Sequence, residues 1–280
     1  MIKLNGHNYK LCLLDTNVVS EMIKRPTVEF RTIFNRFIVS DHLLCLSVFT
    51  IIELRRSPQI YEKFLDFFSF LPSIFLKGYE QLLEAEIDHY PDPSNIDPTL
   101  VAPWGIQLPP GMTRKEALAH LFETQMFCRR EQKWQRSQAS ILRGMLSLLQ
   151  NYSPRKDGRY TPMMISGFVK KVTSYQIKLR APQFFQKYRL SEDKIEVDAF
   201  PSVKMMTFNV FYKFYPDRRK ALKSDVLDII ISSAIPYVDV ILTEKHQAEI
   251  LRKTKKQDHF IDQVEVFTLA DLRPGNTISA

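Results

Sequence analysis

Acidic side chains stand beside apolar runs at widely separated points of the chain. Asp15 directly follows the apolar residues 11–14, and Glu53 has apolar residues on both sides. Far along the chain, Asp228 precedes three isoleucines, and Glu244 comes shortly after another apolar run. Carboxylate oxygens are the ligands that Mg²⁺ and Mn²⁺ prefer, and several carboxylates brought together repel one another without a cation. Such a cation polarises a phosphoryl oxygen and activates water, so the pattern indicates phosphodiester cleavage.

Several of the acids also have a structural explanation. An Asp at a strand end can cap the helix that follows, as Asp15 would. Two arginines closely follow Glu53, which can therefore lie with them on a solvent-exposed helix face. Asp225 stands near an expected helix start, where acids favour the helix dipole. It also competes with Asp228 as a ligand, because residues three apart share one helix face.

The sequence predicts elements that would bring these acids together. Short, continuous apolar runs are typical of strands buried in a parallel sheet, and the amphipathic segments between them indicate helices. In an open α/β sheet, ligands bind beyond the carboxyl ends of the strands, where such acids would stand. We therefore expect an α/β fold with strands at residues 11–14, 43–46, 73–76, 240–242 and 264–269.

Composition weakens the case for several functional classes. The 280-residue chain has only 8 glycines and neither a GxGxxG nor a Walker-type motif, so a nucleotide-cofactor fold lacks sequence support. The cysteines Cys12, Cys45 and Cys128 show no zinc-binding spacing, and their odd number favours a reducing cytoplasm. The sequence shows no signal-peptide pattern and no apolar run of about 18 residues, so we expect no membrane partner.

Charge is distributed unevenly along the chain. The net charge is +8, but residues 113–222 contain 22 Lys and Arg against 9 Asp and Glu, a net of +13, which leaves −5 for the rest. A basic part that binds nucleic acid beside an acidic part that binds metal would produce this division, and so would chance clustering. Prolines between residues 91 and 110 precede the basic part, where helices are expected at residues 114–128 and 131–150.

Basic and aromatic residues of this part are candidates for contact with RNA. Phosphates would pair with Lys and Arg, and unpaired bases would stack on aromatic rings. The aromatic candidates, for which the alternative is a place in a helical core, are Trp134, Tyr160, Tyr175 and Tyr188. The basic candidates are Arg129, Arg130, Lys133, Arg136, Arg155, Lys156, Lys170 and Lys171.

Four segments resemble the motifs of PIN-domain ribonucleases, especially those of bacterial toxin–antitoxin pairs, and they occur in the family's order. Residues 14–21, Leu-Asp-Thr-Asn-Val-Val-Ser-Glu, resemble the opening motif. Residues 47–56 are similar to the second acidic segment and residues 228–234 to the third. Residues 240–243, Val-Ile-Leu-Thr, look like the family's strand that ends in Thr.

The resemblance implies a PIN-like three-layer α/β/α fold with a central parallel sheet, formed by residues 1–89 and 220–280 and interrupted by a basic, mainly helical insertion at residues 90–219. It implies a cytoplasmic endoribonuclease that uses Mg²⁺ or Mn²⁺ to hydrolyse RNA. Besides RNA, its partners would be a protein inhibitor or antitoxin and a second copy of the chain. Family positions carry over to the metal ligands Asp15, Glu53 and Asp228, with Asp225 as a competing acid, and to the polar supports Thr16, Asn17 and Thr243.

Two departures from the family pattern leave other interpretations open. Two residues after Thr243 the family often carries an acid, but this chain has Lys245, so Glu244 would have to replace it as a catalytic acid. Compact family members also lack the insertion. A second interpretation is therefore a catalytically inactive PIN-like module that binds nucleic acid or a protein. A third, a phosphatase of the haloacid dehalogenase type, would need an Asp where this chain has Asn17.

Overall fold

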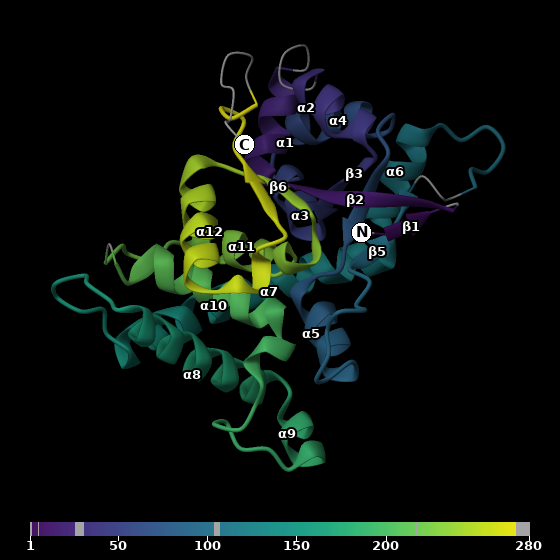
Figure 1. Ribbon diagram of the computed structural model, residues 1–280. Coiled ribbons are helices and arrows are strands. Elements are labelled where there is room, and N and C mark those ends of the chain that lie inside the picture. The colour runs from purple at the N-terminus through teal and green to yellow at the C-terminus, as the bar shows by residue number, and fades with distance from the viewer. Residues whose placement is uncertain (1, 5, 26–30, 104–106, 217, 273–280) are drawn as a thin grey trace.

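A mostly parallel sheet forms the centre of the molecule (Figure 1). The structure is a computed structural model that describes residues 2–4, 6–25, 31–103, 107–216 and 218–272. Across the sheet the strands follow the order β5-β4-β3-β2-β6-β7. Their bounds are β2 (His7–Leu14), β3 (His42–Ser47), β4 (Ser73–Leu76), β5 (Thr99–Val101), β6 (Val240–Leu242) and β7 (Glu265–Phe267).

Strand β2 is an inner strand with a parallel neighbour on each side. It pairs with β3 on one side and with β6 on the other, where Leu14 stands opposite Leu242. Residues 11–14 are fully buried, as expected for a strand covered on both faces. The two antiparallel pairings add β5 beside β4 and β1 (Ile2–Leu4) beside β2. The predicted parallel strands are therefore confirmed, although β7 is shorter than expected.

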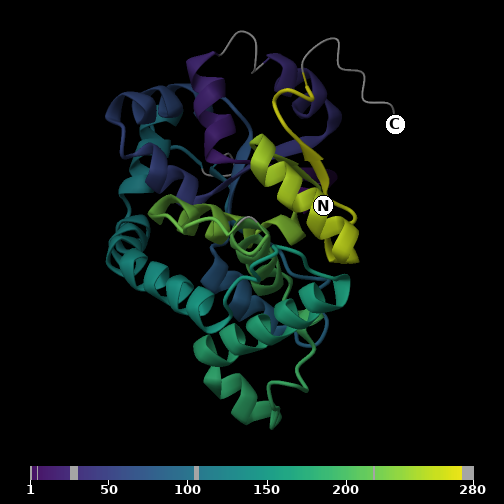
Figure 2. The same cartoon turned by 90° about the vertical axis from the view of Figure 1, so that its left-hand side faces the viewer.

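Helices cover both faces of this sheet, which is compatible with three α/β/α layers (Figures 1 and 2). Most helices of the first and last parts of the chain directly follow a strand, so the N-termini of these helices stand at the carboxyl edge of the sheet. The helices formed by the first and last parts of the chain are α1 (Thr16–Lys24), α2 (Arg31–Arg36), α3 (Val48–Leu54), α4 (Pro58–Phe68), α5 (Tyr79–Asp88), α11 (Lys223–Ser232) and α12 (Lys245–Gln257).

The middle of the chain is mainly helical. Its helices are α6 (Arg114–Glu123), α7 (Gln125–Asn151), α8 (Pro162–Arg180), α9 (Pro182–Tyr188) and α10 (Pro201–Phe214). The break expected near residue 129 occurs instead at Thr124, whose hydroxyl donates a 2.7 Å hydrogen bond to the Leu121 carbonyl. In both views α8 and α9 lie at the opposite end of the molecule from α1 and α4 (Figures 1 and 2).

Helix α10 joins the middle part of the chain to the hydrophobic core around the sheet. Nearly all of its residues are buried, and it packs against α5, α8, α11 and α12. Phe122 of α6 likewise packs edge-to-face on Phe75 of β4, with ring centroids 5.1 Å apart. The middle helices and the sheet therefore share one core. Among the described residues, no helix combines the length and the apolarity needed to cross a membrane.

Candidate functional site

Three carboxylates from distant parts of the chain line one small pocket at the carboxyl edge of the sheet. Asp15 follows β2, Asp228 lies on α11, and Glu244 follows β6. Because β2 and β6 are adjacent and parallel, their carboxyl ends stand side by side. We call this the acidic pocket, lined by Leu13, Asp15, Asp228, Ile231, Ser232, Ile235, Ile241, Thr243, Glu244 and Gln247.

Asp15 both caps a helix and lines the acidic pocket. Its Oδ1 accepts a 2.7 Å hydrogen bond from the backbone N–H of Thr16, at the start of α1. Its Oδ2 accepts a second 2.7 Å bond, from the hydroxyl of Thr243. Asp15 therefore caps a helix and also belongs to the candidate site, so both explanations given for it apply. The two bonds fix the orientation of the carboxylate.

Burial and neighbouring negative charge change the acid strength of this site. Burial raises the pKa of Asp15 to about 6; the charges of Asp228 and Glu244 add to the rise, against the two hydrogen bonds. Burial also raises the pKa of Glu53, and the charge of Asp228 contributes, while a hydrogen bond with Thr16 opposes the shift. The charge of Asp228 thus acts on both Asp15 and Glu53. Glu53 itself is not among the described residues that line the acidic pocket.

Asp228 is paired with a lysine from the middle of the chain. The Nζ of Lys213, on α10, lies 2.6 Å from Oδ2 of Asp228. The side chain of Lys213 is only 1% exposed, whereas that of Asp228 is 40% exposed. Lys213 was not predicted, although a lysine within Phe-Tyr-Lys-Phe-Tyr at residues 211–215 signals a buried charge that needs a partner.

Asp225 stands one turn before Asp228 but makes different contacts. Its side chain is 1% exposed and forms ion pairs with Arg219 and, at 3.6 Å, with Lys213. Its Oδ2 also accepts a 2.8 Å hydrogen bond from the backbone N–H of Leu222, at the start of α11. Asp225 is not among the described residues that line the acidic pocket. These contacts match the helix-start explanation given for this residue.

The oxygen atoms of the site are ligands that suit a hard cation, but they are not arranged around a single point as a metal ion would require. Carboxylate and hydroxyl oxygens are the ligands that Mg²⁺ and Mn²⁺ take. Within the described residues, however, no three His, Cys, Asp or Glu side chains are placed to hold one metal ion. An ammonium group instead neutralises Asp228. A divalent ion would therefore have to share Asp228 with Lys213 or displace it.

Two amides complete the surroundings of the acids. The side-chain nitrogen of Asn17 donates a 3.1 Å hydrogen bond to Oε2 of Glu244, so this predicted polar support contacts an acid of the pocket. Gln247 lines the pocket and is buried, yet among the described residues its side-chain amide has no hydrogen-bond partner. Burying an amide without a hydrogen-bond partner costs free energy, which is consistent with a polar ligand in the acidic pocket.

The basic residues predicted to contact RNA fall into separate groups. Arg129, Arg130, Lys133 and Arg136 lie on α7, where Lys133 forms a 2.6 Å ion pair with Glu80 of α5. Arg155 and Lys156 lie in the exposed loop between α7 and α8, which extends away from the sheet in Figure 1. Lys170 and Lys171 are exposed on α8. Through Lys133, the α7 group contacts α5, which follows β4.

The aromatic candidates for base stacking differ in exposure. Trp134 is buried and packs edge-to-face on Phe49, with ring centroids 5.2 Å apart, so it belongs to the core. Tyr160 packs on Phe211 in the same way. Tyr175 and Tyr188 are 47% and 38% exposed. The core explanation therefore applies to Trp134 and Tyr160.

No protein-family model, no curated protein and no solved structure matches this chain. The interpretation of the site therefore depends on its own residues and geometry.

Proposed function

We propose that this chain is a PIN-type nuclease that hydrolyses RNA with the help of Mg²⁺ or Mn²⁺. The observation that supports it most is the meeting of Asp15, Asp228 and Glu244 around one pocket, although more than two hundred residues separate the first from the others. Mutual repulsion of acids at such a pocket favours a bound cation, and the edge of a parallel sheet is where α/β proteins bind ligands.

The metal would be held by Asp15 and Asp228, with Glu244 at the same pocket and Glu53 within electrostatic reach of Asp228. When bound, the cation supplies a Lewis acid for the phosphate and an activated water. The chain's own residues orient the ligands: Thr243 and the N–H of Thr16 hold the two oxygens of Asp15. Asn17 holds Glu244 in the same manner.

The RNA backbone would approach along α7. Arg129 and Arg136 are exposed there and stand seven residues apart, on about the same face of the helix. Phosphate contacts of this kind supply affinity without sequence preference. The proposed substrate is therefore single-stranded or structured RNA that is bound through its phosphate backbone.

One observation favours a second candidate function, an inactive PIN-like module that binds nucleic acid. The pairing of Lys213 with Asp228 gives the acidic pocket an internal cation. The negative charge of the pocket is thus partly balanced without a metal, and the basic helices would then bind RNA without cleaving it.

Cleavage of a labelled single-stranded RNA by the full chain, in Mn²⁺ and in EDTA, separates the two candidates. The nuclease proposal expects cleavage in Mn²⁺ only, and Asp15→Asn abolishes it while binding in a gel-shift assay persists. Asp41→Asn is the matched control: Asp41 stands at the opposite edge of the sheet, with a positive φ of 57° that Asn tolerates. Binding without any cleavage would favour the module, and neither cleavage nor binding would overturn both.

A further inference from the structure

A second and much larger pocket lies between the middle helices and the α/β part of the chain. Its volume is about 510 Å³, within the range of about 300–1,000 Å³ that is usual for small-molecule sites. Helices α3, α5, α7, α8, α10 and α11 all contribute to its lining. We call it the interhelical pocket.

The interhelical pocket is separate from the acidic pocket, although α11 borders both. Val226, Ile229 and Ile230 face the interhelical pocket, whereas Asp228 and Ile231 face the acidic pocket. The two sites therefore lie on different faces of one helix. Among the described residues that line the larger pocket, none is an acid of the proposed nuclease site.

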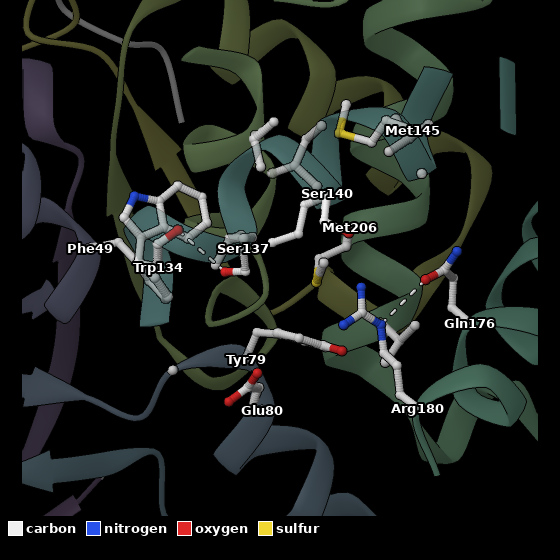
Figure 3. Close-up of a pocket in the computed structure, with 18 of the residues that line it drawn as sticks. Phe49, Tyr79, Glu80, Trp134, Ser137, Ser140, Met145, Gln176, Arg180 and Met206 are labelled. Atoms are coloured by element: carbon white, nitrogen blue, oxygen red, sulfur yellow. Dashed lines mark hydrogen bonds between the residues drawn. The ribbon is translucent and has the colours of Figure 1, made fainter. Parts of the chain in front are cut away.

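One end of the interhelical pocket is aromatic and apolar. Figure 3 shows Trp134 and Phe49 together at this end, with Met145 and Met206 along the cavity. Methionine side chains are flexible and polarisable, so they adapt to a ligand of irregular or mobile shape. This lining favours a hydrocarbon or aromatic body.

The opposite end carries an oriented positive charge. The guanidinium of Arg180 lies over the ring of Tyr79, 4.6 Å from its centroid, and its Nε donates a 3.3 Å hydrogen bond to Gln176 (Figure 3). Arg180 is exposed at the last turn of α8, so a charged group bound to it would remain in contact with water. A planar guanidinium held in this way suits a carboxylate.

The charge of the whole lining also favours an anion. Within the described part of the chain, its charged members are three cations, Arg130, Lys133 and Arg180, and one carboxylate, Glu80. Glu80 already pairs with Lys133 at 2.6 Å. The lining thus keeps an excess of positive charge, to which Arg180 contributes, and this excess favours a ligand with one negative head.

We infer that the interhelical pocket binds an amphipathic monocarboxylate, with its apolar body beside Trp134 and its head at Arg180. Size, apolar lining and the position of the positive charge all match this class of ligand. The inference does not depend on the proposed nuclease function, because its test measures binding and not cleavage.

The test uses dodecanoate as the probe and isothermal titration of the full chain below the micelle concentration. Saturable binding with one site is expected, and dodecyltrimethylammonium, which has the opposite charge, should bind at least about tenfold more weakly. Arg180→Gln should also weaken dodecanoate binding at least about tenfold, the effect of removing one charge-assisted hydrogen bond.

A pair of glycine substitutions shows where the probe binds. Gly144 of α7 lines the interhelical pocket, and a Cβ added there meets no atom within 4 Å. Gly144→Leu should therefore narrow the pocket and weaken binding, while it also improves the helix propensity of α7. Gly167→Leu is the matched control, because Gly167 has the same open surroundings on α8 but does not line the pocket.

Several results would overturn the inference. Dodecanoate that fails to bind saturably, or that binds no better than the cationic amphiphile, rules out an anion site. Equal binding to the Gly144→Leu and wild-type chains places the probe elsewhere. Adenosine monophosphate that binds in the pocket and displaces dodecanoate would assign it to a nucleotide instead.

Discussion

The ammonium group of Lys213 lies 2.6 Å from a carboxylate oxygen of Asp228, so a buried cation from α10 stands at an acid of the candidate metal site. Asp225, which is also buried, lies 3.6 Å from the same ammonium. One lysine thus contacts acids on two adjacent turns of α11, and Arg219 is a further cation beside Asp225. The ion pair ties the middle helices to the acidic pocket.

Replacing Lys213 with Met should destabilise the protein. The substitution keeps the apolar stem but removes the cation paired with Asp228 and leaves Asp225 with Arg219 alone, which costs about 3 kcal/mol of unfolding free energy. Urea denaturation measures the change. Lys223→Met, at the exposed start of α11, is the control and should change the unfolding free energy little.

The same Lys213→Met variant also tests metal binding. If the acids accept a cation, Mn²⁺ raises the melting temperature of the variant more than that of the wild type, because the ion replaces the missing ammonium. An equal response of both proteins to Mn²⁺ contradicts the assignment of Asp228 as a metal ligand.

Thr243→Val should weaken metal binding without disrupting the fold. Valine matches threonine in shape but removes the hydroxyl that orients Asp15. Loss of such an orienting hydrogen bond lowers metal affinity by about 10- to 100-fold. Titration with Mn²⁺ measures the loss. Thr254→Val is the control, since the buried hydroxyl of Thr254 donates its hydrogen bond within α12, to the Ile250 carbonyl. Equal Mn²⁺ affinities of the two variants would show that Thr243 does not support metal binding.

Glu86 should make stability depend on pH. This fully buried carboxyl of α5 accepts hydrogen bonds from the N–H and hydroxyl of Ser202, and burial raises its pKa from 4.5 to about 7. Between these values the folded state holds a proton that the unfolded state has released. Its contribution is therefore fully present below pH 4.5 and is lost as the pH rises through 7, by about 3 kcal/mol in all.

Denaturation of the wild type and of Glu86→Gln from pH 4.5 to 8 measures this dependence. The stability of the wild type relative to the variant should fall across the interval. Glu84→Gln, an exposed position on the same helix, should show no such trend. A relative stability that stays constant with pH would show that Glu86 titrates normally.

Arg129 and Arg136 should contribute to RNA affinity by pairing with phosphates. Replacing both with Gln lowers affinity and reduces the salt dependence of binding, by a slope of about 0.7 for each phosphate of a single strand that is no longer neutralised. Fluorescence anisotropy at several salt concentrations gives both quantities. Lys63→Gln, exposed on α4, is the control for a general loss of positive charge. An unchanged salt dependence of binding would show that RNA does not contact these arginines of α7.

The sequence predicted the strands whose formation depends on the local pattern of apolar residues. Continuous apolar runs indicated the strands β2, β3, β4 and β6, because burial on both faces leaves little choice of residue type. It also predicted that Asp15 and Glu244 would approach each other, since both follow strands and the strand ends of a parallel sheet meet at one edge. These relationships follow from pattern and topology.

Interactions that depend on tertiary packing were not predictable in the same way. Lys213 is paired with Asp228 only because α10 packs beside α11, and no spacing rule connects a helix of the middle segment to that acid. The different roles of Asp225 and Asp228 depend likewise on Arg219, which precedes α11 and pairs with Asp225. The break at Thr124 reflects a single side-chain hydrogen bond, which helical periodicity does not encode.

The order of strands in the sheet bears on how the protein is made. β6 completes the pairing of β2, yet it is translated more than two hundred residues later. At about 5–20 residues per second, a ribosome needs roughly 10 to 45 s to cover that distance. Throughout this interval one side of an apolar strand has no native neighbour, which makes the nascent chain a natural client for chaperones.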